Sequence, residues 1–106
     1  MDKKVKAAWV KALRGGEYRQ GRGALRKTFK SGDQYCALGV LCDVVKPDWW
    51  HQTAKNWYHA YGTDLPSLDL LELAGLTPTQ RTHVIILNDD DKLPFTKIAD
   101  WVEKNL

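Results

Sequence analysis

The glycine-rich basic stretch at 17–27, EYRQGRGALRK, contains the residue types that bind anions. Its glycines let backbone amides approach an anion, its arginines offer planar forks for phosphate, and Tyr18 can stack on a base. The GRG tripeptide alone is a weak phosphate motif, because neither a strand-then-helix context nor full glycine spacing accompanies it. The alternative is a glycine-shaped turn whose arginines are solvated or paired with Asp89 and Asp90. The sequence leaves both interpretations open.

The acidic run NDDD at 88–91 follows a predicted helix. Consecutive carboxylates do not converge on a cation as the alternating ones of calcium loops do, so a helix end capped by Asn88 is favoured over a ligand contact or a metal site. Carboxylates at a helix C-terminus oppose the macrodipole and need a counter-charge. We therefore predict that Asn88, Asp89 and Asp90 pack close to the loop from Tyr18 to Arg26 and form one composite site with it, in which the carboxylates orient the arginines and Asn88 bonds the glycine-rich backbone.

The two cysteines, Cys36 and Cys42, offer the main route to catalysis. They are six residues apart, which places them on different faces of a helix, and neither belongs to a CxxC pair. We expect buried, unreactive thiols, no disulfide and no zinc site. A cysteine nucleophile would need a base, for which His83 is formally available. A small hydrolase that uses Cys36 or the acidic run is the enzymatic alternative to a protein with no catalytic residue and no cofactor.

The tryptophans divide into two groups. Trp9 and Trp101 lie beside apolar neighbours on predicted helices and are expected in the core. Trp49 and Trp50 are adjacent, so in an extended segment they cannot both point inward, and one should show a face to solvent or to a partner. The residues predicted to contact a ligand or partner come from the basic stretch, this aromatic pair and the acidic run: Tyr18, Arg19, Gln20, Arg22, Arg26, Lys27, Trp49, Trp50, Asn88 and Asp89.

The elements that would position these residues begin with an N-terminal amphipathic helix, for which Asp2 is the expected N-cap and Gly15-Gly16 the stop. Its apolar residues recur at helical spacing: Val5, Ala8, Trp9, Ala12 and Leu13. The stretches ALRKTF and YCALG flank a Ser-Gly-Asp turn and predict a short hairpin. The apolar run at 38–45 fits a buried helix ended by Pro47, with a buried strand as the alternative.

The second half of the chain is predicted to be helical. Pro66 opens a short helix that stops near Gly75, and Thr77 begins a capping box for a helix that runs to the acidic run. The last helix starts at Pro94, and the aromatic stretch 48–64 is left open between a short helix and irregular structure. Together these elements predict a single domain, 1–106, of the α+β class, helix-dominated, with about five helices and one short β-hairpin.

The charge is unevenly distributed along the chain. Residues 1–63 contain twelve Lys and Arg against five Asp and Glu, a net charge of +7, whereas residues 64–106 contain four against eight, a net charge of −4. The two halves either attract one another in the fold or leave a basic face for phosphate. No apolar run approaches the length of a membrane span, and the N-terminus lacks a signal-peptide apolar stretch, so we expect no membrane contact and a cytoplasmic location.

Three stretches resemble a family of small bacteriophage and prophage proteins: YRQGRGALR, YCALGVLCDV and LNDDD followed by FTKIADWVEKNL. The chain departs from that family's pattern at Ala37, where a second cysteine is usual, and at Asp91, where glycine is usual. The resemblance implies a phage-derived protein in the cytosol of a bacterial host. Small phage proteins often act in counter-defence, which is an analogy of setting and not of mechanism.

We therefore expect a non-enzymatic binding protein. Within the setting that the resemblance implies, it would be a counter-defence inhibitor that occupies a host defence protein or an anionic nucleotide signal through a basic and aromatic face, as anti-CRISPR proteins or signal sponges do. The runner-up is a nucleic-acid-binding accessory protein that uses the basic half of the chain.

Overall fold

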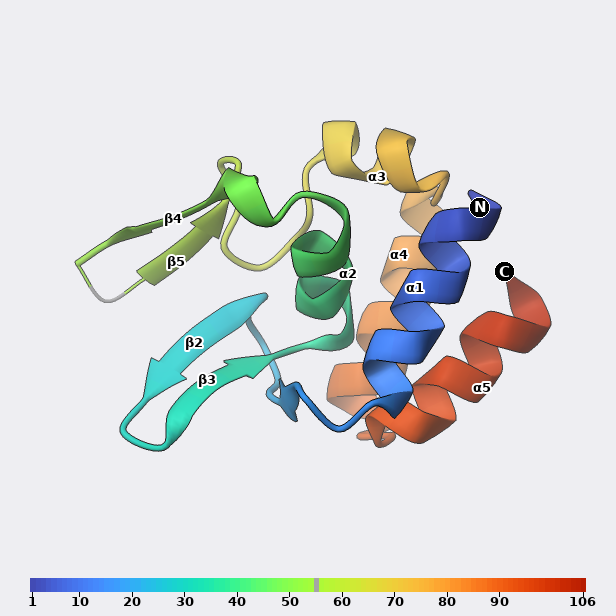
Figure 1. Ribbon diagram of the computed structural model, residues 1–106, viewed down its shortest axis with the longest axis horizontal. Coiled ribbons are helices and arrows are strands. Elements are labelled where there is room, and N and C mark those ends of the chain that lie inside the picture. Colours follow the sequence, from blue (N-terminus) through green and yellow to red (C-terminus); the bar gives the residue numbers. More distant parts are fainter. Residues whose placement is uncertain (55) are drawn as a thin grey trace.

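A helical body carries two β-hairpins on one side (Figure 1). The computed structural model describes residues 1–54 and 56–106. Its α-helices are α1 (Lys3–Arg14), α2 (Ala37–Val45), α3 (Leu68–Ala74), α4 (Pro78–Ile85) and α5 (Phe95–Asn105). Its strands are β1 (Arg19–Gln20), β2 (Arg26–Phe29), β3 (Gly32–Tyr35), β4 (Trp50–Thr53) and β5 (Asn56–His59). A 3-10 turn, Pro47–Trp49, follows α2, and a π-helical turn, Ile86–Asp90, extends α4.

The helical body forms where the sequence predicts it. Asp2 caps α1 by accepting a hydrogen bond from the backbone N–H of Val5, at 2.9 Å. The capping box at the start of α4 is complete, because the side chains of Thr77 and Gln80 each bond the other's backbone N–H. Helix α1 packs on α5, where Arg14 pairs with Asp100 at 2.7 Å and with Glu103 at 3.0 Å. At this contact, the basic and acidic halves of the chain attract each other.

The apolar core lies between α2 and the helices around it. Trp9 is fully buried and donates its indole N–H to the carbonyl of Ala37 at 2.9 Å, which joins α1 to the start of α2. Gly39 is required for the close approach of the chain before β2, because a Cβ there would lie 1.8 Å from the carbonyl oxygen of Leu25. Helix α2 is thus the apolar centre of the fold, and its identity as a helix decides against the strand alternative.

Trp101 was expected in the core and is instead half-buried on α5. Its ring packs against that of His83, with the ring centroids 4.4 Å apart. The core positions of α5 are taken by Phe95, Ile98, Ala99 and Val102. The indole therefore lies beside the apolar stripe and covers the contact between α4 and α5.

The prediction of a single hairpin is wrong, because the fold contains two small sheets. In the first, β2 and β3 form a hairpin near the predicted place, but β3 begins at Gly32, inside the predicted Ser-Gly-Asp turn, and most of the predicted second stretch, YCALG, lies at the start of α2. Strand β1 adds a short parallel strand to β3, giving the order β1-β3-β2. The second sheet is the antiparallel hairpin β4–β5. It falls in the aromatic stretch that the sequence left between a short helix and irregular structure. Strand β1 is only two residues long and exists through pairing with β3, so no local sequence pattern predicts it.

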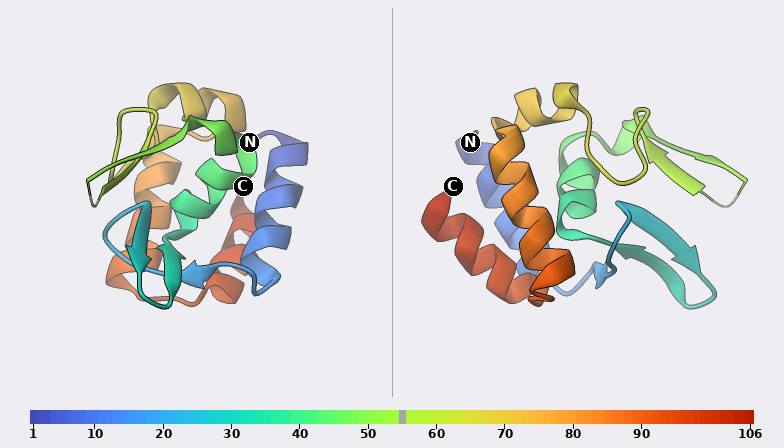
Figure 2. Two further views of the ribbon diagram at one scale, coloured as in Figure 1. Left: turned by 60° about the vertical axis from the view of Figure 1, so that its left-hand side comes forward. Right: turned by 180° about the vertical axis from the view of Figure 1, so that it is seen from behind.

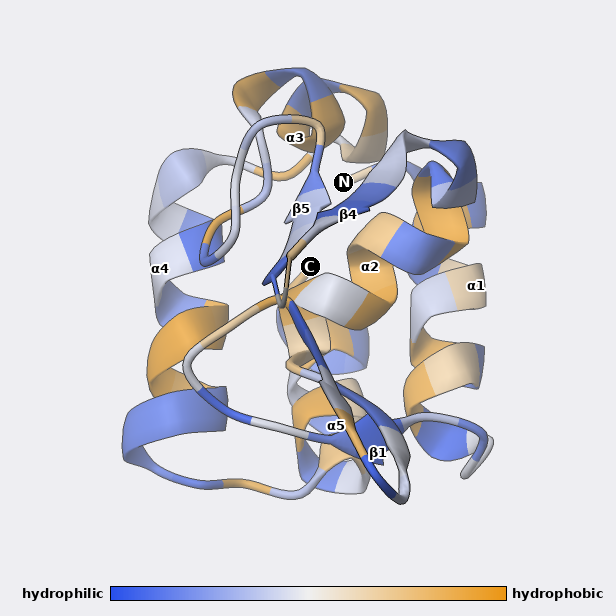
Figure 3. Ribbon diagram, turned by 90° about the vertical axis from the view of Figure 1, so that its left-hand side faces the viewer, coloured by the Kyte–Doolittle hydropathy of each residue, from blue (hydrophilic) through white to orange (hydrophobic). Residues whose placement is uncertain are grey.

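The two hairpins project from the same side of the helical body (Figures 1 and 2). Viewed from that side, the hairpins are mainly hydrophilic, and the apolar helix α2 lies behind them (Figure 3). We call the two hairpins together, residues 26–35 with 50–54 and 56–59, the double-hairpin arm. None of the helices in the described ranges is long and apolar enough to cross a membrane.

Candidate binding surface

Asn88 joins the glycine-rich loop to the turn after α4. Its side chain is almost fully buried, and its Oδ1 accepts from Gln20 Nε2 at 3.0 Å and from the backbone N–H of Ala37 at 3.2 Å. Its Nδ2 donates to the carbonyl of Gly21 at 3.0 Å. One carboxamide therefore connects the loop, the start of α2 and the end of α4. This confirms that the two distant stretches pack together and that Asn88 bonds the loop backbone.

The predicted pairing of loop arginines with the acidic run is wrong. Arg22 donates from Nε to the backbone carbonyl of Asn88 at 3.1 Å, and Asp89 accepts from the backbone N–H of Gly23 at 3.3 Å. A helix end leaves carbonyls without intrahelical partners, and the guanidinium satisfies one of them. The counter-charge that the acidic run was expected to need is therefore supplied by arginine bonded to the helix end, without an ion pair to a carboxylate.

The other two arginines of the loop also have internal partners. Arg19 donates to the carbonyl of Ser31 at 3.0 Å, and Arg26 donates two hydrogen bonds to one carboxylate oxygen of Asp33. The cavities beside the loop have volumes of about 10 Å³, next to Asp89, and about 50 Å³, next to Lys27. Small-molecule sites usually occupy roughly 300 Å³ or more. These two cavities are therefore too small for a nucleotide.

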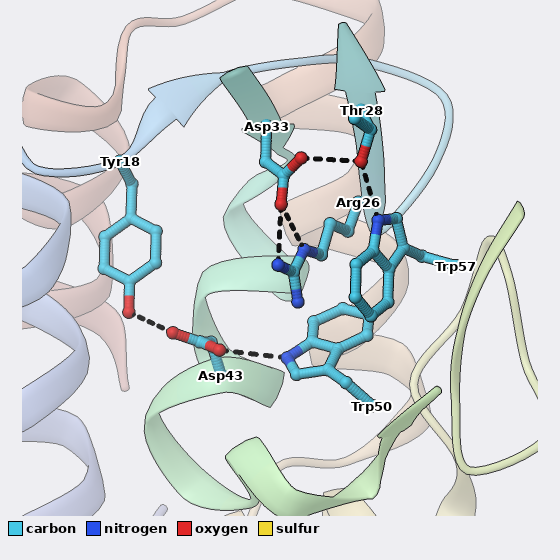
Figure 4. Close-up of polar contacts among 7 residues, drawn as sticks. All are labelled: Tyr18, Arg26, Thr28, Asp33, Asp43, Trp50 and Trp57. Carbon is cyan, nitrogen blue, oxygen red and sulfur yellow. Dashed lines mark hydrogen bonds and ion pairs between the residues drawn. The ribbon is translucent and has the colours of Figure 1, made fainter. Parts of the chain in front are cut away.

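Arg26 lies between the two hairpins (Figure 4). Its Nε and Nη2 donate to Asp33 Oδ2 at 2.8 Å and 2.6 Å, and its guanidinium carbon lies 3.7 Å from the ring centroid of Trp57. Tyr35 and Trp50 also flank the cation, with ring centroids 5.2 Å and 5.3 Å from the same carbon. The side chain is 17% exposed, so its charge is largely shielded by aromatic faces.

A chain of hydrogen bonds completes the contact between the hairpins. Trp57 Nε1 donates to Thr28 Oγ1 at 2.8 Å, and that hydroxyl donates to Asp33 Oδ1 at 2.6 Å (Figure 4). Burial alone would raise the pKa of Asp33, but hydrogen bonds from Thr28 and Arg26 outweigh it and lower that pKa below its usual value. The carboxylate stays ionised and holds both the cation and the hydroxyl that reach the second hairpin.

Asp43, on α2, anchors the base of the arm. One carboxylate oxygen accepts a hydrogen bond from the Tyr18 hydroxyl, and the other accepts from Trp50 Nε1 at 3.0 Å. Burial and this hydrogen bond raise the pKa of Tyr18 well above its ordinary value, so the phenol keeps its proton. Tyr18 and Trp50 were both predicted as contacts for a ligand, and both lie in this junction as structural partners of Asp43.

The remaining member of the aromatic pair, Trp49, lies away from Arg26. Its ring packs against buried His59 with the centroids 5.7 Å apart, and the Lys46 ammonium lies 5.7 Å from its centroid. Both Trp49 and Trp50 are half-buried, which confirms that the pair does not point wholly inward.

Sequence reasoning missed most of the residues that hold the two hairpins together around Arg26 and at the base of the arm: Thr28, Asp33, Tyr35, Asp43 and Trp57. A signal was present for some of them. In the β2–β3 register Arg26 pairs with Tyr35 and Thr28 with Asp33, so these four side chains share one face of the hairpin.

The outer faces of the arm carry cations and aromatic rings that the inner contacts do not use. Lys27 and Phe29 alternate with the inward residues of β2; Lys27 is exposed and Phe29 is 46% exposed. On the second hairpin His51 and Tyr58 form a cross-strand pair with nearly parallel rings, 5.2 Å between centroids and 9° between planes. Lys30 lies exposed at the tip of the first hairpin.

The thiols are poorly suited to nucleophilic chemistry. Cys36 is buried at the N-cap of α2, where its Sγ accepts from the backbone N–H of Gly39 at 3.3 Å, and burial raises its pKa to about 11. Burial also raises the pKa of Cys42 well above its ordinary value. Both cysteines are free, as expected. These protonated thiols argue against the cysteine-hydrolase alternative, and no metal-type group of three or more His, Cys, Asp or Glu occurs within the described ranges.

The family model of a domain of unknown function, DUF8296, matches residues 1–69, which include the whole arm. The chain belongs to this family. No curated protein and no solved structure matches the chain.

Proposed function

We propose that this member of the DUF8296 family is a non-enzymatic binding protein that presents the outer faces of the double-hairpin arm to an anionic macromolecule. The observation that carries the proposal is a difference between the inward and the outward side chains of the arm. Inward side chains such as Arg26 and Trp57 are occupied by each other, whereas the outward Lys27, Phe29 and Lys30 have no such role. Exposed cations interleaved with exposed rings suit a partner that has both phosphates and flat bases.

Single-stranded nucleic acid is the partner class that this chemistry favours. Lysines attract the backbone without reading sequence, and each exposed ring offers a stacking platform worth roughly 1–3 kcal/mol per base. The cavities near the basic loop are too small to enclose a free nucleotide, which weighs against a nucleotide sponge. The stacked pair His51 and Tyr58 extends the aromatic surface onto the second hairpin.

The resemblance to phage proteins adds a setting to the proposal. In the cytosol of a bacterial host, a protein of this kind would serve counter-defence by occupying a host defence component that carries nucleic acid. The cross-hairpin contacts support such a role, because they hold both outer faces in one orientation before binding. Less ordering entropy is then lost in the complex, which favours affinity.

The test is fluorescence anisotropy with labelled single-stranded DNA and RNA oligonucleotides over a range of salt concentrations. The wild-type protein should bind, with affinity falling steeply as salt rises, and the Lys27→Gln/Lys30→Gln variant should bind more weakly with a shallower salt dependence. The matched control is Lys97→Gln/Lys104→Gln, which removes the same charge from α5 and should bind like wild type. No binding, or equal losses in both double variants, would show that the arm is not a nucleic-acid surface.

A further inference from the structure

A groove of about 460 Å³ lies away from the arm's inner contacts, between the loop that leads into α3 and the start of α4. Three large apolar side chains beside it are exposed to an unusual degree: Tyr61 at 73%, Leu68 at 63% and Leu65 at 43%. Single exposed apolar residues are ordinary, but a contiguous group around a groove marks an interaction surface. The proposed nucleic-acid surface does not use these residues.

The loop that presents these residues is held firmly. Ala60 adopts a left-handed backbone conformation, φ 56°, which is unfavourable for a residue with a Cβ, and it directly precedes Tyr61. The backbone N–H of His59 donates to the carbonyl of Gly62 at 2.9 Å, and a Cβ at Gly62 would lie 2.4 Å from the carbonyl oxygen of Leu65. The exposure of Tyr61 therefore follows from a turn whose backbone conformation is constrained.

Arg81, on α4, lines the same groove and has one hydrogen-bond donor that is unsatisfied within the described residues. The residue is half-buried, and its Nε is buried without a hydrogen-bond partner among residues 1–54 and 56–106. A buried donor that is left unsatisfied costs roughly 1–3 kcal/mol, and more on a charged group. That Nε is enclosed by the chain and out of reach of a second molecule, but the guanidinium also brings a positive charge to the groove, and none of the ion pairs among residues 1–54 and 56–106 includes it. The groove therefore suits a partner that brings a carboxylate beside an apolar side chain.

The chain itself has that combination at the same place. Asp64 lines the groove together with Tyr61 and Leu68. One patch thus contains exposed apolar groups, a guanidinium and a carboxylate, so its charges can pair with those of the same patch on a second copy. Two-fold symmetric interfaces require this property, because the same patch faces itself across the axis.

We propose that this patch is the interface of a two-fold symmetric dimer of the chain. Tyr61 and Leu68 of each copy enter the groove of the other, and Arg81 of each copy pairs with Asp64 of the other. The dimer would place two double-hairpin arms in one particle. This inference does not depend on what the arms bind.

Sedimentation velocity over a concentration series tests the dimer. The wild-type protein should shift from monomer to dimer as concentration rises, and Leu68→Lys should raise the dimer dissociation constant about tenfold or more. Because Leu68 is 63% exposed, this variant should fold normally, which circular dichroism verifies. The matched control is Leu73→Lys, at a residue of α3 that is 47% exposed and does not line this groove, and it should dimerise like wild type.

Charge reversal tests the ion pair separately. Arg81→Glu should weaken the dimer, and combining it with Asp64→Arg should restore dimerisation. A wild-type protein that stays monomeric up to its solubility limit would overturn the proposal. So would a dimer that persists unchanged in Leu68→Lys, or one that the double charge reversal does not restore.

Discussion

Arg26 and Trp57, which are 31 positions apart in the sequence, stack across the two hairpins, with 3.7 Å between the guanidinium carbon and the ring centroid. The same cation donates two hydrogen bonds to one carboxylate oxygen of Asp33 on its own hairpin. Because it contacts side chains of both hairpins, Arg26 aligns them through packing and charge together.

The stack predicts measurable coupling between the hairpins. In a double-mutant cycle of Arg26→Ala and Trp57→Ala, chemical denaturation should give a coupling free energy of about 1 kcal/mol, typical of a partly desolvated cation–π contact. Arg26→Ala alone should cost more than Trp57→Ala, because it leaves Asp33 without its cation. Additive effects within error would show that the hairpins are aligned by other contacts.

The Asn88 carboxamide should be one of the most sensitive positions in the chain. Asn88→Ala should lower the free energy of unfolding by about 2–3 kcal/mol, because Ala37 and Gly21 lose their buried partners. Asn88→Asp should be destabilising too, since a carboxylate would face the carbonyl of Gly21 and the side chain of Asp89. Lowering the pH should partly rescue Asn88→Asp and leave Asn88→Ala unchanged. An Asn88→Ala protein as stable as wild type would show that this carboxamide does not hold the loop, α2 and α4 together.

The thiols should be inert in the folded protein. Because burial raises the pKa of Cys36 to about 11, a disulfide reagent at pH 8 should modify neither cysteine until denaturant is added. Cys36→Ala should lose about 1 kcal/mol of stability, as expected for removal of a buried group that also caps α2, while its binding activity is kept once it is folded. Rapid labelling of Cys36 in the native state, or a folded Cys36→Ala variant without activity, would revive the enzymatic alternative.

His59 should make stability depend on pH. It is fully buried, its Nε2 bonds the carbonyl of Lys46 at 2.8 Å, and burial lowers its pKa below the ordinary value near 6.5. As pH falls below about 6.5 the unfolded chain takes up a proton that the folded protein resists, so the free energy of unfolding should decrease. His59→Gln, which keeps a donor but does not titrate, should flatten this dependence in thermal melts at pH 5 and 7.5. His51→Gln, at an exposed site, is the matched control and should leave it unchanged.

Local sequence signals determined most of the helical elements. The apolar spacing of α1, the Asp2 cap and the Thr77–Gln80 capping box each involve residues within a few positions of one another, so their energetics can be judged without knowing the fold. The β2–β3 hairpin was only partly predictable in this way, because Gly32 and Asp33 of the predicted turn pair with β2 as part of β3. Even the long-range contact of Asn88 with the glycine-rich loop was predictable, because a helix end and a glycine-rich backbone have complementary needs.

Tertiary structure alone decided which partner each charged or aromatic side chain took. Arg26 had several acidic residues available in the sequence, and it pairs with Asp33 because the β2–β3 register places both on one face. Trp57 and the hairpin that carries it became part of the candidate surface only through contact with that face. A charge or a ring gains free energy from whatever lies within a few ångströms, and that distance depends on the packing of the whole chain, which no stretch of residues specifies by itself.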